Sequence, residues 1–580
     1  MESDKFHRVE KRDGMIVEWD APIPAGDDLI LRADIFRPDS DTRFPAILTY
    51  GPYGKGLAFQ DGNASAWQRM TDAFPDTAAG STNLYQNWEV PDPEKWVPDG
   101  YAIVRVDSRG AGRSPGFLDP WSSRETRDVY ECIEWVAAQS WCTGKIGMNG
   151  ISYYAMNQWY AAALQPPHLA AICVWEGAAD YYREVSRHGG IYCQFFENLY
   201  PRALLRVQHG LGERGMRSRV TGDLVSGPET LSERELAANR VAVDEWILQR
   251  PLDGKDYRER SPVWENVKVP VLSAANWGGQ GLHTRGNFEG FLECASSQKW
   301  LEVHGEAHWV HFYTDYGVDL QKRFLGYFLK GEDTGWEKQP KVLLQVRHID
   351  KFVPRQEQEW PLARTHWTKF YLAPDGSSLT PDEPFGSGKV TYEAMGDNPL
   401  FLSEPFTHQT EITGPVAAKL FLSSSTADAD VFLALRVFDP AGKEIVFHGS
   451  NDPRTPVGLG WLRASHRKLD EVRSKPYRPF HSHDQLDPLV PGEPVELDIE
   501  IWPTSIVVPV GYRVGLAVRG QDYHCDGPPL AIPGVKYSLT GVGPFLHERP
   551  EDRPPSLFAG KQTIHFEHGR MPYLLLPIIP

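Results

Sequence analysis

The sequence is poor in cysteine, and the few cysteines it has are scattered. Its 580 residues include only 6 cysteines, with no CxxC pair and no closely spaced framework. A disulfide scaffold is therefore not predicted, and we expect reduced, mostly buried thiols.

Long apolar runs are also lacking. No stretch approaches the roughly 18 consecutive apolar residues of a membrane span. The charged segment from Met1 to Val17 has no apolar centre of the kind that marks a signal peptide. We therefore expect a cytoplasmic protein without a membrane partner.

Positive charge is in deficit, since the formal net charge is -17 at pH 7. This balance argues against nucleic acid and anionic membranes as partners. Hydrophobic residues make up 41% and charged residues 24% of the chain, which is ordinary for a soluble globular protein. A chain of 580 residues is expected to form two or three domains, and it contains no internal repeat.

The first part of the chain alternates between strand and helix patterns. An amphipathic helix is predicted over 125–138, because Val129, Cys132, Ile133 and Val136 recur at helical spacing. Such alternation predicts a mostly parallel sheet covered by helices. The expected strands are 101–106, 145–148, 170–175, 269–275 and 299–303, and further helices are expected over 284–294 and 320–329.

Two other segments break this alternation. Residues 181–261 resemble a helical insertion, in which a capping box from Ser232 to Glu235 leads into a helix predicted over 236–248. The polar segment 56–98 has no strong pattern and is a candidate for part of a site wall. From about residue 341 onward, short alternating strands separated by Pro and Gly turns predict an all-β sandwich or jelly roll.

One turn in the alternating region carries a chemical signal. Gly150-Ile151-Ser152 lies between a predicted strand and a predicted helix. A serine at such a turn is exposed at the end of a sheet, and the N-terminus of the following helix offers N–H groups to a developing oxyanion. Gly150 lets the backbone turn sharply. Ser152 is thus a candidate nucleophile, and the alternative is a serine that caps a buried helix.

Several motifs together indicate a family. They are Gly51-Pro52-Tyr53-Gly54-Lys55, Asp107-Ser108-Arg109-Gly110, Gly150-Ile151-Ser152-Tyr153, Gly305-Glu306-Ala307-His308 and Ile412-Thr413-Gly414-Pro415. With these motifs, the chain resembles the cocaine-esterase-like (CocE/NonD) hydrolases, which are related to X-Pro dipeptidyl-peptidases and α-amino-acid ester hydrolases. The resemblance implies an α/β-hydrolase domain over 1–180 and 262–345, a helical cap over 181–261 and a jelly-roll β-sandwich over 346–580.

The resemblance also implies roles for individual residues. Ser152 matches the nucleophile and His308 matches the general base. The N–H of Tyr153, the residue after the nucleophile, and the hydroxyl of Tyr53 match the two donors of the oxyanion hole. The alternatives are a loop tyrosine that anchors its own turn and a histidine packed near the sheet edge.

The acid of the triad is where the sequence departs from the family pattern. Gly279 stands where family members carry an aspartate, in Asn276-Trp277-Gly278-Gly279-Gln280. Glu176 follows a strand and keeps the chain order of serine, acid and histidine, so we favour it. Its alternative role is to pair with Arg183. Asp180, Glu306, a water molecule or a backbone carbonyl are the other candidates for orienting His308. The Gly278-Gly279 pair suggests a backbone that passes close to another group, either a substrate group or the relocated carboxylate.

The predicted function is cleavage of a carboxylic ester, or of an amide, through an acyl-enzyme on Ser152. Tyr154, Trp159 and Trp175 would add apolar surface to the substrate site, which favours an uncharged acyl group, although ordinary core packing explains all three equally well. The expected partner is a small-molecule ester or amide, and a homo-oligomer is left open.

Alternatives within the serine hydrolases and from two other classes remain. The chain could be an X-Pro dipeptidyl-peptidase or an amino-acid ester or amide acylase, or a catalytically silent binding protein on a hydrolase fold. A metal-dependent hydrolase using His304, His308 and His311 is disfavoured, because these histidines do not form HExxH on one helix face. No cofactor and no metal site are predicted.

Overall fold

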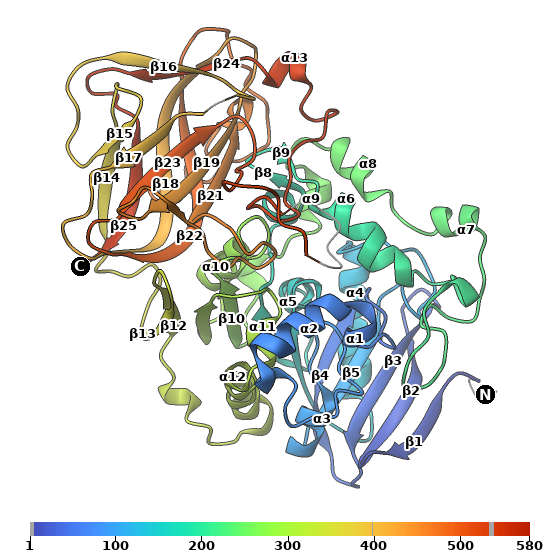
Figure 1. Ribbon diagram of the computed structural model, residues 1–580. Coiled ribbons are helices and arrows are strands. Elements are labelled where there is room, and N and C mark those ends of the chain that lie inside the picture. Colours follow the sequence, from blue (N-terminus) through green and yellow to red (C-terminus); the bar gives the residue numbers. More distant parts are fainter. Residues whose placement is uncertain (1–4, 397, 533–538) are drawn as a thin grey trace.

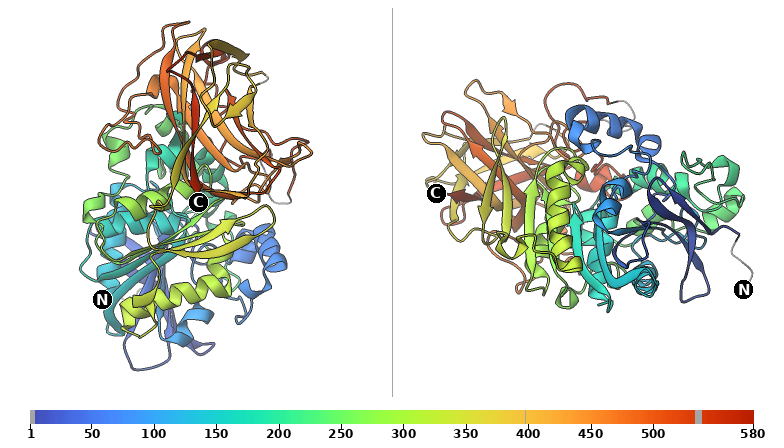
Figure 2. Two further views of the ribbon diagram at one scale, coloured as in Figure 1. Left: turned by 90° about the vertical axis from the view of Figure 1, so that its left-hand side faces the viewer. Right: turned by 90° about the horizontal axis from the view of Figure 1, so that it is seen from below.

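The computed structural model describes residues 5–396, 398–532 and 539–580, and it contains two large sheets. Figure 1 shows an N-terminal part with a helix-covered sheet and, beside it, a C-terminal β domain. The views in Figure 2 show that the β domain stacks against one side of the first part. Among the described residues, none of the helices combines the length and apolar character that a membrane span requires.

The first sheet has 11 strands and a parallel centre. Strands β5, β4, β6, β7, β10, β11 and β12 pair in parallel, as the strand–helix alternation predicts, and antiparallel strands extend both edges. Their order and bounds are β1 (Arg8–Arg12), β2 (Met15–Pro24), β3 (Ile30–Pro38), β5 (Ala102–Asp107), β4 (Phe44–Gly51), β6 (Cys142–Ile151), β7 (Leu169–Trp175), β10 (Val271–Asn276), β11 (Lys299–His304), β12 (Val342–Arg347) and β13 (Phe352–Glu357).

The central strands are buried on both faces. In β7, Ile172 and Val174 belong to one core cluster, whereas Ala171 and Cys173 belong to another, as expected when successive side chains point to opposite sides. Helices α4 (Ser123–Ala137) and α5 (Tyr153–Ala163) contribute to the first cluster, and α12 (Asp315–Leu325) contributes to the second. Such double coverage explains why these strands read as continuous apolar runs.

The predicted helices of the alternating region are confirmed. The helix expected over 125–138 is α4, the one expected over 284–294 is α10 (Thr284–Glu293), and the one expected over 320–329 begins earlier, as α12. Two short helices, α1 (Phe59–Gly62) and α2 (Ala64–Ala73), and α3 (Pro93–Trp96) lie in the segment that had no clear pattern, and α11 (Val310–Tyr313) precedes α12.

The insertion after β7 differs from the prediction in one respect. The capping box at Ser232 is present, but the helix predicted over 236–248 is two helices, α7 (Glu233–Ala238) and α8 (Val243–Leu248). The break arises because Leu118 exchanges backbone hydrogen bonds with Asn239 and Val241. The remaining elements of the insertion are β8 (Arg187–His188), β9 (Ile191–Tyr192), α6 (Phe195–Leu199) and α9 (Lys255–Arg258).

The C-terminal β domain is built on a 12-stranded sheet with mostly antiparallel pairing and its own apolar core. A short helix, α13 (Pro555–Phe558), precedes its last two strands. The strands are β14 (His366–Leu372), β15 (Ser378–Thr380), β16 (Gly388–Glu393), β17 (Leu400–Ser403), β18 (Thr410–Ser424), β19 (Asp430–Phe438), β20 (Glu444–Ile445), β21 (Gly458–Arg463), β22 (Val495–Val508), β23 (Arg513–Arg519), β24 (Lys561–Phe566) and β25 (Tyr573–Ile579).

The predicted end of the first domain, at residue 345, lies too early in the sequence. Strand β13 pairs with β12 along its length, so the first sheet continues to Glu357. The second sheet begins with β14 at His366. Sequence patterns missed this because β13 is a half-exposed edge strand whose composition resembles that of the strands that follow it.

A loop of the β domain passes directly over the Gly278-Gly279 turn of the first domain. The N–H of Ser450 donates to the carbonyl of Gly278, at 2.9 Å. A Cβ atom on Gly278 would lie 2.5 Å from the Cα atom of Gly449. The group that lies close to Gly278 is therefore the backbone of the other domain, and not the substrate group or relocated carboxylate that the sequence suggested.

This contact yields a stability prediction. Gly278→Ala should lower the free energy of unfolding by about 1–3 kcal/mol, because backbone atoms of the loop must move to admit the methyl group. The matched control is Gly254→Ala, since the backbone φ there is -94° and the nearest atom to a Cβ, the Leu252 carbonyl oxygen, would lie 4.0 Å away, an ordinary van der Waals contact. Denaturant unfolding of both variants gives the comparison, and equal stabilities would contradict the prediction.

Candidate active site

The turn after β6 holds Ser152 in a conformation that few residues adopt. Its backbone has φ 58° and ψ -113°, and α5 begins at the next residue. Such strain is typical of a nucleophile elbow, where a strand turns abruptly into a helix. Gly150 makes the turn feasible, because a Cβ there would lie 2.6 Å from the Cβ of Tyr154.

Both expected oxyanion donors lie beside Ser152. Burial raises the pKa of Tyr53 well above its ordinary value, so the phenol stays protonated, and this outweighs the effect of the Ser152 side chain, which lies close enough to the Tyr53 hydroxyl to lower its pKa. The N–H of Tyr153 is the first of α5, and helix-initial N–H groups have no acceptor within the helix. One O–H donor, from Tyr53, and one N–H donor, from Tyr153, therefore lie at the N-terminal end of α5.

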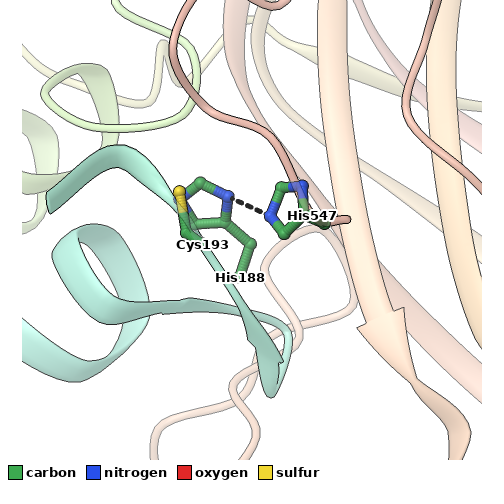
Figure 3. Close-up of side chains that lie close together, drawn as sticks. All are labelled: His188, Cys193 and His547. Atoms are coloured by element: carbon green, nitrogen blue, oxygen red, sulfur yellow. Dashed lines mark hydrogen bonds between the residues drawn. The ribbon is translucent and has the colours of Figure 1, made fainter. Parts of the chain in front are cut away.

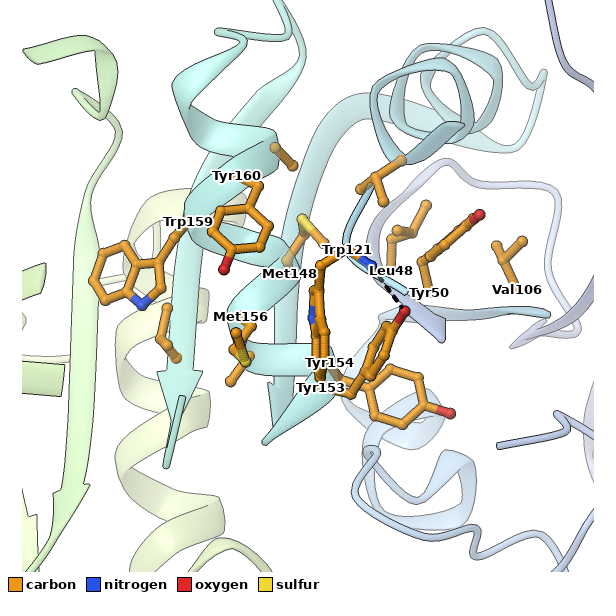
Figure 4. Packing of buried hydrophobic residues seen from close by; sticks show 14 of the residues in the cluster. Leu48, Tyr50, Val106, Trp121, Met148, Tyr153, Tyr154, Met156, Trp159 and Tyr160 are labelled. Atoms are coloured by element: carbon orange, nitrogen blue, oxygen red, sulfur yellow. Dashed lines mark hydrogen bonds between the residues drawn. The ribbon is translucent and has the colours of Figure 1, made fainter. Parts of the chain in front are cut away.

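The residues behind the elbow are packed tightly. The Tyr153 ring stacks on Trp121 with centroids 4.1 Å apart, and its hydroxyl donates to Glu125 at 2.6 Å. Figure 4 shows Trp121 against Tyr153 and the hydrogen bond between the Trp121 backbone and the Tyr153 hydroxyl. This packing fixes the start of α5, and with it the direction of the Tyr153 N–H.

The structure brings Glu176 and His308 together. Glu176 follows the end of β7, and one of its oxygens lies 2.8 Å from Nδ1 of His308. Its other oxygen lies 3.0 Å from Nε2 of His304, and Asn276 donates to that same oxygen at 3.3 Å. Burial acts to raise the pKa of Glu176, but the two histidines outweigh it and hold the pKa at about 2.

The other candidate acids are engaged elsewhere. Asp180 caps the turn at Tyr182 and pairs with Arg183 at 2.8 Å, so the arginine considered as a partner for Glu176 binds Asp180 instead. Glu306 contributes its backbone carbonyl, which accepts a hydrogen bond from Asn276 at 2.9 Å. Gly279 leaves no room for a side chain, because a Cβ would lie 2.9 Å from the Thr284 hydroxyl.

Two expected substrate contacts are wrong. Trp159 is fully buried and packs on Trp264 with centroids 5.3 Å apart, and Figure 4 shows it on the side of α5 away from Tyr154. Trp175 is also in the core, where its ring packs on His304 and Phe312. Both are core residues because they sit on the inward faces of α5 and β7.

The third expected substrate contact remains near the site. Tyr154 packs edge-on to Tyr53 with centroids 5.6 Å apart. Together with Trp88 and Arg206, these two tyrosines line a small cavity. An aromatic wall beside the Tyr53 hydroxyl is consistent with the expected apolar surface.

Sequence reasoning missed Glu89, which contacts the catalytic candidate directly. Its carboxylate lies 3.0 Å from Nε2 of His308, the ring nitrogen opposite the one that faces Glu176. It is buried, its backbone φ is 64°, and its carbonyl accepts the N–H of Ile151 at the end of β6. A glutamate set between Trp88 and Val90-Pro91 is the signal that could have drawn attention to it, since charges in apolar runs are buried in partnership.

Two further contacts complete the surroundings of His308. The His283 ring stacks on it with centroids 4.7 Å apart and planes 9° apart. Ser450 reaches in from the β domain, where its carbonyl accepts the His308 N–H and its hydroxyl lies 3.4 Å from Glu176. Nothing in the local sequence around Ser450 signals this, because the contact depends on how the two domains pack.

The trio His304, His308 and His311 does not form a metal site. In the described chain, their ligand atoms do not gather closely enough to hold one ion. His304 instead lies between two carboxylates, with Nδ1 2.6 Å from Glu302 and Nε2 3.0 Å from Glu176. Burial lowers the pKa of His311 to about 3.

A serine on a strand-to-helix elbow and a histidine–carboxylate pair, which follow the carboxyl ends of strands in one parallel sheet, are the features of a hydrolase with the α/β-hydrolase fold. Residues 27–313 match the X-Pro dipeptidyl-peptidase (S15 family) model, and residues 334–575 match the model of the X-Pro dipeptidyl-peptidase C-terminal non-catalytic domain. The chain is 26% identical to a cocaine esterase of Rhodococcus, over 86% of this chain and 90% of that protein.

Solved structures agree with these matches. A CocE/NonD family hydrolase from Staphylococcus aureus superposes with a TM-score of 0.82 at 30% identity, covering 99% of this chain and 96% of that one. An α-amino-acid ester hydrolase shares the fold, with a TM-score of 0.66 at 15% identity over 100% of this chain and 99% of that one. The chain therefore belongs to the CocE/NonD family of hydrolases, with an α/β-hydrolase domain and a C-terminal β domain.

The two carboxylates around His308 lead to a prediction on pH dependence. Burial alone lowers the pKa of His308, but Glu176 and Glu89 outweigh it and raise the pKa to about 10. Only the neutral imidazole can accept a proton from Ser152, so the rate of fluorophosphonate labelling should rise with pH into the alkaline range. Glu89→Gln removes one carboxylate and should move the midpoint of this rise about one to two pH units lower.

The labelling experiment has a built-in control. Ser152→Ala should abolish labelling at every pH. Glu94→Gln alters an acidic residue that hydrogen-bonds Ser81 and Thr82 rather than His308, so its midpoint should equal that of the wild type. A midpoint that stays in place in Glu89→Gln would show that the Glu89–His308 contact does not control the base.

Proposed function

We propose that the protein cleaves carboxylic ester bonds through an acyl-enzyme on Ser152. The contact that carries this proposal is the 2.8 Å approach of Glu176 to Nδ1 of His308. It supplies the histidine–acid half of a triad although the usual aspartate position holds Gly279. A carboxylate on Nδ1 selects the tautomer whose Nε2 can take the serine proton.

The proposed reaction has two steps. The Ser152 oxygen attacks the ester carbonyl while its proton passes to Nε2 of His308, and the oxyanion is held by the Tyr53 hydroxyl and the Tyr153 N–H. The carbon–oxygen bond then breaks, and His308 returns the proton to the departing alcohol. A water molecule attacks the acyl-enzyme in the same way, which releases the acid and restores Ser152.

Glu89 has a defined place in this scheme. In the resting structure its carboxylate pairs with Nε2 of His308, which is the nitrogen that must accept the proton of Ser152. The reaction therefore requires His308 to exchange Glu89 for Ser152 when substrate enters. We infer that Glu89 holds the imidazole in the resting state and releases it in the working state.

A second candidate function is hydrolysis of esters or amides that carry a free α-amine. It is favoured by one observation, namely that Oε2 of Glu89 is buried without a hydrogen-bond partner among the described residues. A substrate ammonium group could pair with that oxygen and, at the same time, release His308 from Glu89. The uncharged acyl group remains our first choice, because the wall formed by Tyr53, Tyr154 and Trp88 is aromatic.

The β domain carries a proposal of its own. We infer from the resemblance that its strands follow jelly-roll topology, with the helical insertion after β7 acting as the cap of the site. Long-range antiparallel pairing of β18 with β22, β24 and β25 supports the first inference.

The triad proposal predicts graded losses of activity. On p-nitrophenyl esters, Ser152→Ala should lower kcat about 10⁵–10⁶-fold, and Glu176→Gln should lower it about 10⁴-fold, because the imidazole loses its orienting partner. Glu306→Gln is the matched control, since its carboxylate was the rival acid, and it should keep nearly full activity. Retained turnover in Ser152→Ala would exclude the acyl-enzyme, and an unlabelled, inactive wild type would indicate a silent fold.

The choice of acyl group can be tested with a pair of substrates. Methyl 3-phenylpropanoate and phenylalanine methyl ester differ only in the α-amine, and our first choice predicts a higher kcat/KM for the former. If the amine-bearing ester is instead faster, the second candidate function stands, and Glu89→Gln should then reduce that preference about tenfold or more. Because the kcat/KM values of the two substrates are compared within one variant, any change in the His308 pKa affects both values and cancels in their ratio.

A further inference from the structure

Three potential metal ligands meet where the insertion touches the β domain. His188 lies in the β8–β9 hairpin, Cys193 follows that hairpin, and His547 lies in the β domain. Figure 3 shows the two imidazoles facing each other beside the Cys193 sulfur. Their ligand atoms all lie within 4.8 Å of one another, and all three side chains are buried.

The partners of His188 fix which of its nitrogens carries the proton. Its Nε2 lies 3.3 Å from the backbone carbonyl of Glu184. A carbonyl oxygen only accepts hydrogen bonds, so Nε2 must be the protonated nitrogen. In the neutral ring, the Nδ1 of His188 then keeps its lone pair, and it is this nitrogen that faces His547.

The partners of His547 fix its tautomer in the same way. Its Nδ1 lies 2.8 Å from one oxygen of Asp522, and the other oxygen of Asp522 accepts the His547 backbone N–H at 2.8 Å. A carboxylate that accepts two hydrogen bonds requires a proton on Nδ1. The Nε2 of His547 therefore also presents a lone pair, aimed at His188.

Two lone pairs thus face each other at a distance of 2.9 Å between His188 Nδ1 and His547 Nε2. That arrangement needs a cation between the nitrogens. A shared proton would serve the two nitrogens but would not involve the Cys193 sulfur, which lies within 4.8 Å of both nitrogens. A divalent metal uses all three groups, and its charge is balanced by a Cys193 thiolate and the Asp522 carboxylate.

We propose that His188, Cys193 and His547 bind a zinc ion that joins the insertion to the β domain. Two imidazoles and one thiolate are ligands that zinc favours, and they supply three of its four positions. Asp522 behind His547 is the outer-shell carboxylate that orients many zinc-binding histidines. Tetrahedral zinc separates two nitrogen ligands by about 3.3 Å, so binding opens the histidine pair by about 0.4 Å.

The surroundings indicate a structural rather than a catalytic ion. The His188 ring packs on Trp461 with centroids 4.5 Å apart and on Trp502 with centroids 5.5 Å apart. The three side chains leave the fourth position of the ion to a water molecule, and an ion between these packed groups would be bound as the chain folds. The ion would fasten the hairpin to the β domain without touching the proposed triad.

The test is the metal content of the full-length, untagged chain purified from zinc-supplemented cells. We expect about one zinc per chain after dialysis against buffer, measured by plasma mass spectrometry. Cys193→Ser and His547→Gln should each reduce the content to below about 0.1 per chain. Cys294→Ser is the matched control, because that thiol is equally buried but lies outside the cluster.

A second measurement keeps the test decisive if the variants fail to fold. Wild-type protein loaded with Co²⁺ should show the visible bands of a tetrahedral ion and a sulfur-to-cobalt charge-transfer band, and added Zn²⁺ should remove both. Zinc should also raise the Tm of chelator-treated protein. A wild type that stays metal-free with excess zinc, shows no cobalt spectrum and has an unchanged Tm would overturn the proposal in favour of a proton-bridged histidine pair.

Discussion

The site depends on the contacts that the buried carboxylate of Glu176 makes with the groups around it. Burying a carboxylate away from water costs several kcal/mol of folding free energy unless charged or polar partners surround it. The partners of Glu176 come from separate segments of the chain. His304 ends β11, Asn276 ends β10, His308 lies in the loop after β11, and Ser450 belongs to the β domain. Forming the site therefore requires the parallel sheet and the packing of both domains at once.

The imidazole of His308 lies between two carboxylates with different relations to the sheet. Glu176 follows β7 directly, so its position is as rigid as the strand. Glu89 belongs to a loop that is held by hydrogen bonds from Arg105 to the carbonyls of Tyr85 and Pro91, and by the bond from Ile151 to its own carbonyl. The proposed reaction requires release of the contact on Nε2, whereas the contact on Nδ1 must be kept.

Local signals in the sequence predicted much of the molecule. Alternation of strand and helix indicated the parallel sheet and α4, and the turn at Gly150-Ile151-Ser152 indicated the elbow. Glu176 could be chosen because it follows a strand that ends beside the site. Glu89 and Ser450 could not, since their places depend on loop paths and domain packing over long sequence separations. Trp159 and Trp175 were misjudged for a related reason, because aromatic side chains suit a core and a pocket equally well.

The reach of Ser450 into the site also bears on the order in which the chain is made. A ribosome releases the strands of the first sheet, Ser152 and His308 well before it reaches the loop that passes over Gly278. Domains generally fold as they emerge, so the first sheet forms around a carboxylate that still lacks one of its partners. The nascent chain therefore stays incomplete as an enzyme until its last third has been translated and docked.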